Sequence, residues 1–97
     1  MNIGVCQIEL RLPENHSLKG KRQVIKSITA RLHNSYNVSV AEVDNQGLWQ
    51  IATLGISCIS NSRRHADEIL ANVIRFIIQN YPDVELLNSK VEVFPAF

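Results

Sequence analysis

Residues 38–60 read VSVAEVDNQGLWQIATLGISCIS, and this stretch decides the fold. Its first part, Val38–Asp44, is short and rich in valine, which is typical of a strand. The next three residues, Asn45-Gln46-Gly47, are a hairpin turn signal. In the following arm, Leu48–Ser60, mainly apolar positions alternate with mixed ones, as expected for a strand with one dry face. The stretch therefore predicts a β-hairpin in the middle of the chain.

In the sequence, one strand and one helix precede this hairpin, and one helix and one strand follow it. Strands are predicted from the alternation of side chains, and helices from apolar residues that recur every three or four positions. The predicted elements are a strand over residues 3–12, a helix that begins after the N-cap Ser17 and frays near residues 34–37, a helix between the cap Asn61-Ser62 and Pro82, and a strand over Val84–Phe94.

The order β-α-β-β-α-β predicts an α+β, ferredoxin-like sandwich. Two right-handed crossovers place both helices on one face of a four-stranded antiparallel sheet with the spatial order 4-1-3-2. The first and third strands then lie side by side at the centre and run in opposite directions. Cys6 and Cys58 fall at the same end of the helix-facing side, where we expect two neighbouring reduced thiols.

Length and composition allow a single domain over residues 1–97. The chain is 45% hydrophobic and 20% charged, which is typical of a globular domain. A formal net charge of +1 argues against a strongly basic protein and leaves room for a local basic patch. No apolar run approaches the roughly 20 residues of a membrane span, and the N-terminus has no signal-peptide pattern. We expect a cytoplasmic protein with no membrane partner and no disulfide framework.

The first turn of the first helix is unusual because three of its residues are basic. Each cation costs about 0.3–1 kcal/mol at the positive end of the helix dipole. Gly20 costs roughly 1 kcal/mol more, but it lets another backbone or an anion approach closely. At 100° per residue, the cations continue along one face of the helix. We predict an anion- or RNA-binding site on this helix that comprises Ser17, Lys19, Lys21, Arg22, Lys26 and His33.

Two other interpretations of these cations stay open. They can form an ordinary solvated helix face, neutralised by Asp44 and Asp83 at the same end of the domain, or they can contact an acidic protein. A second basic cluster, Arg63-Arg64-His65, starts the other helix at the opposite end of the molecule. Acidic residues follow it within a turn, so we interpret this cluster as ordinary surface.

The predicted sheet has one face that no helix covers and one exposed edge strand. We place Trp49 and Ile51 on the open face, and Val38 and Val40 in the edge strand, which carries neither proline nor lysine to discourage pairing. A partly apolar open face favours a partner, so these four residues are the predicted interface of a homodimer. Stacking of a nucleobase on Trp49, plain exposure, and cover by the tail Pro95-Ala96-Phe97 are the alternatives.

No catalytic arrangement is recognisable, so we predict a binding protein without enzymatic activity or cofactor. The three histidines lack partners at metal-ligand spacing, and no nucleophile elbow or phosphate-binding glycine loop is present. An acylphosphatase-like enzyme shares the size and strand order, but the loop Pro13–Ser17 carries a carboxylate where phosphate would have to lie. The paired stacking aromatics of an RNA-recognition motif are also missing.

Three segments together carry a family resemblance: Ser17-Leu18-Lys19-Gly20-Lys21-Arg22, then Asn37–Val43, then Leu48-Trp49-Gln50 with Ala52–Gly55. In this order they resemble the YlxP-like family of small bacterial proteins, a domain of unknown function, over essentially the whole chain. The resemblance implies the ferredoxin-like fold and a link to ribosome assembly or translation, because the family's genes often lie beside those for translation initiation and ribosome maturation factors. It supplies no reaction. It suggests Ser17, Lys19, Lys21 and Arg22 as an anion-facing helix start and Trp49 as a contact residue.

Two positions depart from the family pattern. Gly20 stands where relatives commonly have an acidic residue, which makes the local charge more positive. Ile51 stands where a basic residue is frequent, which removes a cation near Trp49 and favours a subunit contact there over base stacking.

Overall fold

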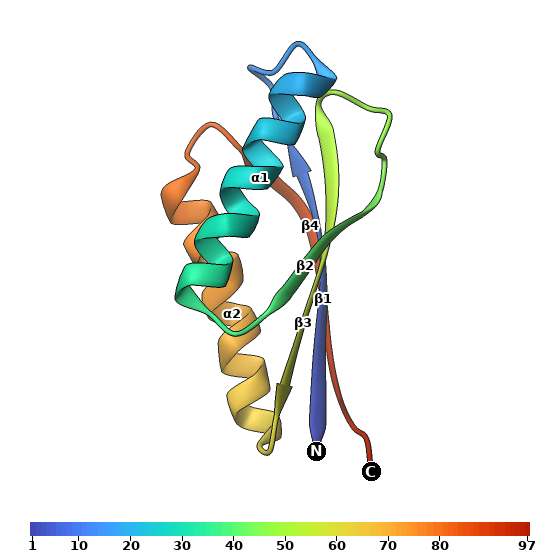
Figure 1. Ribbon diagram of the computed structural model, residues 1–97, viewed down its shortest axis with the longest axis vertical. Helices are drawn as coiled ribbons and strands as arrows, with labels where there is room; N and C mark the ends of the chain where they lie inside the picture. The colour runs from blue at the N-terminus through green and yellow to red at the C-terminus, as the bar shows by residue number, and fades with distance from the viewer.

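The structure is a computed structural model that describes residues 1–97. Its elements are β1 (Asn2–Arg11), α1 (Leu18–Ser35), β2 (Ser39–Asp44), β3 (Ile51–Ser60), α2 (Arg63–Asn80) and β4 (Glu85–Pro95). The strands form one antiparallel sheet in the order β2-β3-β1-β4, and both helices cover the same face of it (Figure 1). The predicted ferredoxin-like sandwich and its strand order are confirmed. Neither helix is long and apolar enough to cross a membrane.

The core lies between the sheet and the two helices. Alternate residues of β1, among them Ile8 and Leu10, point to this side and pair in register with Leu54 and Ala52 of β3. The helices contribute apolar side chains at the predicted three- and four-residue spacing. The buried helix residues of this core are Ile28, Leu32, Ala66, Leu70, Val73 and Ile77.

Gly4 lies where side chains of α2 and β3 pack closely against β1. A Cβ atom at this position would stand 3.0 Å from both Cys58 Sγ and Leu70 Cδ1, and 3.4 Å from Ala66 Cβ. Such distances are tighter than ordinary van der Waals contact, so only glycine lets the helix pack this closely on β1 and β3.

The two cysteines are free and buried on the helix-facing side of the sheet, as predicted. Gly4 pairs with Cys58, and Cys6 pairs with Ile56, so the two thiols are diagonal neighbours on the central strands. Burial raises the pKa of the Cys6 thiol to about 11 and also raises the pKa of Cys58. Both side chains are therefore neutral thiols at physiological pH and act as small core residues.

The central hairpin differs from the prediction at its turn. The strand expected from Leu48 begins only at Ile51, and residues 45–50 form a loop. Asn45 has a left-handed backbone with φ of 60°, and its side-chain Nδ2 donates to Thr53 Oγ1 over 2.8 Å. Just before the loop, the pairing register of β2 shifts between Glu42 and Asp44, which makes Val43 an extra residue in the strand.

Candidate functional site

The start of α1 is held by its own side chains. Ser17 is the N-cap, and its Oγ accepts a hydrogen bond from the Gly20 amide over 3.0 Å. A Cβ atom on Gly20 would stand 2.2 Å from Asn15 Oδ1, so the missing side chain makes room for Asn15. The space expected to admit an anion or another backbone is thus occupied, and the hydroxyl of Ser17 already caps the helix.

Lys21 lies inside the protein, although we predicted it at an exposed anion-binding surface. Its side chain is 0% exposed, and its Nζ lies 2.8 Å from Glu42 Oε2. The same ammonium donates to the carbonyl oxygens of Asn45 over 2.8 Å, Ile51 over 3.0 Å and Gln46 over 3.3 Å. The predicted exposure of Lys21 is therefore wrong. Its charge is used to join α1 to β2 and to both ends of the β2–β3 loop.

The burial of Lys21 is indicated by its position on the helix, which the prediction of an anion-binding site did not take into account. Lys21 precedes Ile28 by seven residues and Ile25 by four, so it lies on the apolar face of α1. Glu42 pairs in register with the buried Leu54, which places its carboxylate on the helix-facing side of β2. A basic residue on an apolar face and an acidic residue at an inward strand position together indicate a buried ion pair.

Five of the six predicted site residues remain on the surface, and we call the four basic ones the basic stripe: Lys19, Arg22, Lys26 and His33. The three ion pairs of the protein involve Lys21, Arg11 and Arg64, and none reaches the basic stripe. Neither Asp44 nor Asp83 forms an ion pair, so the expected neutralisation by these two carboxylates is not found. The first turn of α1 contains no acidic residue either. Lys19, Arg22 and Lys26 of the stripe are thus cations that the protein's own carboxylates leave unpaired.

Trp49 lies in the β2–β3 loop, and the prediction that it is on the open sheet face is wrong. Asn15 Nδ2 donates to the backbone oxygens of both Ser17 and Trp49, and so connects the loop to the helix cap. Gln50 Nε2 donates to the carbonyl oxygens of Pro13 and Asn15 over 3.4 and 3.2 Å. Sequence reasoning missed Asn15, because nothing local to it indicates a bond to a residue 34 positions away.

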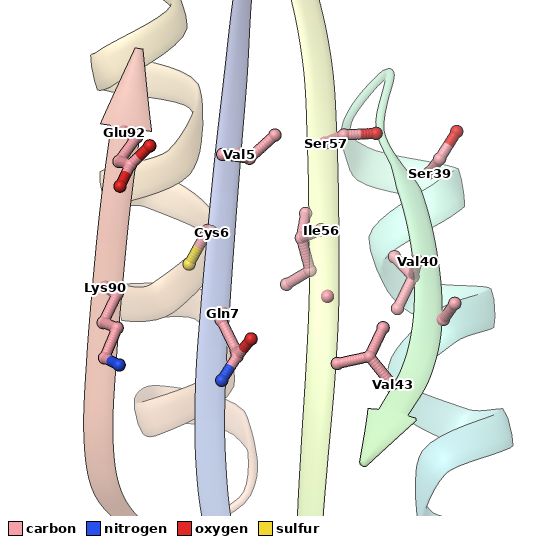
Figure 2. A pocket seen from close by; sticks show the side chains of 12 residues that line it. Val5, Cys6, Gln7, Ser39, Val40, Val43, Ile56, Ser57, Lys90 and Glu92 are labelled. Atoms are coloured by element: carbon pink, nitrogen blue, oxygen red, sulfur yellow. The ribbon is translucent and has the colours of Figure 1, made fainter.

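The open face of the sheet is divided into an apolar end and a hollow middle. Ile59, Ile3 and Phe94 pair in register and form one row across β3, β1 and β4. Beside this row lies a shallow groove of about 490 Å³. Figure 2 shows Val5 and Gln7 of β1 in its centre, with Lys90 and Glu92 of β4 on one side and Val43 of β2 on the other.

Of the four predicted interface residues, only Ile51 lies on this face as predicted, because it pairs in register with Arg11 on the side of β1 that carries Ile3. Val38 is buried, and Val40 pairs in register with the buried Ile56 on the helix-facing side. A partner at the β2 edge would therefore meet the strand's backbone rather than these two side chains. Ile51 begins β3 at the charged end of the sheet, opposite Arg11 and far along the strand from the apolar row. No group of three or more His, Cys, Asp or Glu side chains is placed to hold a metal ion.

Comparisons with known proteins identify relatives and the fold. A family model described as a protein of unknown function, DUF503, matches residues 3–91. The chain is 36% identical over 92 residues to the uncharacterized protein YlxP of Bacillus subtilis strain 168, and the match covers 95% of this chain and 99% of that protein. These matches agree with the resemblance found in the sequence.

Solved structures similar to this chain show the fold alone. A de novo designed protein with a ferredoxin fold matches with a TM-score of 0.58 and 10% identity, over 97% of this chain and 84% of that chain. A C-terminal segment of the alpha subunit of aIF2 from Pyrococcus abyssi matches with a TM-score of 0.52 and 11% identity, over 100% of this chain and 51% of that chain.

Proposed function

The chain belongs to the DUF503 family of proteins of unknown function, and we propose that it is a non-enzymatic module that binds the phosphate backbone of RNA along the basic stripe. The observation that carries this proposal is the unpaired state of Lys19, Arg22 and Lys26. Lys19 and Arg22 lie at the start of α1, where they oppose the helix dipole, and no carboxylate forms an ion pair with them or with Lys26. These cations lower the stability of the helix, and a polyanion bound there would offset that loss.

The length of the stripe suits a polynucleotide better than a single phosphate. Lys19 and Lys26 are seven residues apart, which is about 10 Å along a helix. Successive phosphates of one strand are spaced by about 3.4 Å along the axis of duplex DNA, so a stripe of this length can meet more than one phosphate of a polynucleotide. The gene neighbourhood implied by the family resemblance supports RNA of the translation apparatus, such as a ribosomal particle, as the first partner to test.

Neutralising the stripe tests this proposal. The triple variant Lys19→Gln, Arg22→Gln, Lys26→Gln is expected to reduce affinity for single-stranded RNA at least about tenfold at low salt. In a plot of log affinity against log salt concentration, the slope should become less steep by about 2, because each lost phosphate contact contributes about 0.7. Fluorescence anisotropy of a labelled RNA across a salt series measures both quantities. The melting temperature should be nearly unchanged, because all three side chains are exposed.

A matched control has the same change of net charge on the other helix. Arg63, Arg64 and Arg75 are exposed on α2, so the triple change to glutamine there should leave RNA affinity within about twofold. Equal losses in both triple variants would contradict the proposal, because they would indicate attraction by net charge alone. Capture from lysate that resists nuclease and depends on the stripe would indicate an acidic protein partner instead.

The open sheet face supports a second candidate, assembly of two copies of the chain. The row Ile59, Ile3 and Phe94 exposes apolar surface, with Ile59 66% and Phe94 41% exposed. Lys90 and Glu92 lie two residues apart on the same face of β4 (Figure 2). A two-fold axis between them would bring each ammonium to the carboxylate of the other copy. The face is therefore self-complementary in charge as well as apolar, and we propose a homodimer through it.

Light scattering tests the dimer directly. The protein is expected at twice its chain mass of 11.0 kDa at micromolar concentration, and Ile59→Glu should return it to the mass of one chain. Ile78→Glu is the control, because Ile78 is 51% exposed on α2, away from the open face. A single-chain mass for the unaltered protein at about 100 μM would remove this candidate.

A further inference from the structure

Trp49 presents an exposed indole on a loop whose backbone is fixed. The residue is 53% exposed. Asn15 holds its carbonyl oxygen, and the Lys21 ammonium holds those of Asn45 and Ile51, on either side of the loop. The indole is thus displayed by a loop that is already ordered, so a ligand that contacts it meets little entropy cost for fixing the backbone.

The surroundings of this side chain are open and mainly apolar. An open hollow of about 350 Å³ is lined by Leu48, Trp49, Gln50 and Ile51, and Leu48 is itself 49% exposed. Two large apolar side chains exposed next to each other on one ordered loop are a candidate contact surface, because burial of both by a ligand is favourable.

The same loop adjoins the start of the basic stripe. Lys21, in the first turn of α1, holds the loop carbonyls from the buried face of the helix, and Lys19 and Arg22 lie on the exposed face of the same two turns. Asn15 also joins the loop to the cap of α1. Unpaired cations and an exposed indole are therefore held on one rigid frame. A ligand that combines negative charge with flat rings satisfies both features, and a nucleotide strand is such a ligand.

We propose that Trp49 is a stacking platform for an unpaired base of single-stranded RNA whose phosphates lie on the basic stripe. This inference rests on the proposed function and narrows it to RNA with accessible bases. Duplex RNA keeps its bases stacked inside the helix and would engage the stripe alone. Ile51 stands where relatives often have a basic residue, so the cation that this position would supply is missing. This loss does not oppose stacking, because Lys19 and Arg22 of α1 supply positive charge for the phosphates.

Fluorescence of Trp49 tests the proposal, because it is the single tryptophan of the chain. Single-stranded RNA of about 12 nucleotides is expected to quench its emission, a length within the usual range of single-strand binding sites. Inorganic polyphosphate of similar length should bind and compete with the RNA while leaving the emission unchanged, because it has no bases. The same RNA annealed to its complement should also bind with little quenching.

Variants at Trp49 separate stacking from charge. Trp49→Ala is expected to weaken single-stranded RNA binding by about 5- to 100-fold and to leave polyphosphate binding unchanged, whereas Trp49→Phe keeps most of the affinity. The melting temperature of each variant verifies that the fold is intact. Unchanged emission with bound RNA, or full RNA affinity in Trp49→Ala, would overturn the stacking and leave the proposed function standing. Quenching of equal size by polyglutamate would also overturn it, in favour of an acidic protein. If neither RNA nor polyphosphate binds, the proposed function itself fails.

Discussion

Lys21→Met is expected to lower the free energy of unfolding by about 3–5 kcal/mol, the typical cost of removing one partner of a buried ion pair. Methionine fills the space of the side chain but has no ammonium. The carboxylate of Glu42 would lose its ion-pair partner, and the carbonyl oxygens of Asn45, Gln46 and Ile51 would lose their common donor. For a domain of this size the melting temperature should fall by about 15 °C or more, which calorimetry or circular dichroism measures directly.

The partner residue should matter less. Glu42→Gln is expected to cost about 1–2 kcal/mol, because Lys21 keeps its carbonyl acceptors and the side chain of Glu42 is 20% exposed. The double variant Lys21→Met, Glu42→Gln should be more stable than the sum of the two single changes by about 0.5–3 kcal/mol. Lys19→Met is the control, with an expected change within about 0.5 kcal/mol, because Lys19 is exposed and unpaired. A melting temperature of Lys21→Met within about 3 °C of the unaltered protein would show that the buried ammonium contributes little.

Gly4→Val is expected to destabilise the protein by about 3 kcal/mol. Even the Cβ atom alone would press on Cys58 Sγ and Leu70 Cδ1 at 3.0 Å, and the two methyl groups of valine need further space in a core that has little. Valine is otherwise the better strand former, by up to about 1 kcal/mol. The strand propensity of valine alone would stabilise the protein. A loss of stability would therefore identify steric crowding against Cys58 and Leu70 as the cause.

Gly47 provides the control for this substitution. No atom lies within 4 Å of a Cβ built there, and its backbone φ is not positive. Gly47→Val should therefore change the free energy of unfolding by no more than about 0.5 kcal/mol in denaturant titrations. If Gly4→Val were as stable as Gly47→Val, α2 would have to shift away from the sheet at little cost, which would contradict the close packing described above.

The elements of the fold could be predicted because their signals are local. Ser17 and Ser62 cap the helices by accepting bonds from Gly20 and His65, three residues further along the chain. The alternation in residues 3–12 fixed which side of β1 faces the helices. The strand order followed from the element order and the right-handedness of crossovers. The two cysteines are neighbours as predicted, because the register of β1 and β3 depends on the local apolar pattern of each strand.

The candidate site was predicted only in part, because Lys21 was grouped with the cations of the exposed helix face although its spacing to Ile25 and Ile28 places it on the apolar face. Lys19, Arg22 and Lys26 are exposed as expected, but Lys21 is not. The alternation of side chains around Trp49 predicted a strand there. The residue lies in a loop instead, because hydrogen bonds from distant residues hold the backbone of this segment. The bonds that hold the loop join Lys21 and Asn15 to partners 24 to 34 positions further along the chain.

The amino-acid sequence by itself determined the helices, the strands, their order and the apolar faces that meet in the core. These properties depend on periodicity and on capping within a few residues, which any segment carries alone. Only the tertiary structure decided which oxygen atoms surround the buried ammonium of Lys21 and where the single indole is displayed. Those outcomes depend on which oxygen atoms come within hydrogen-bond distance when remote segments pack, and no local pattern specifies them.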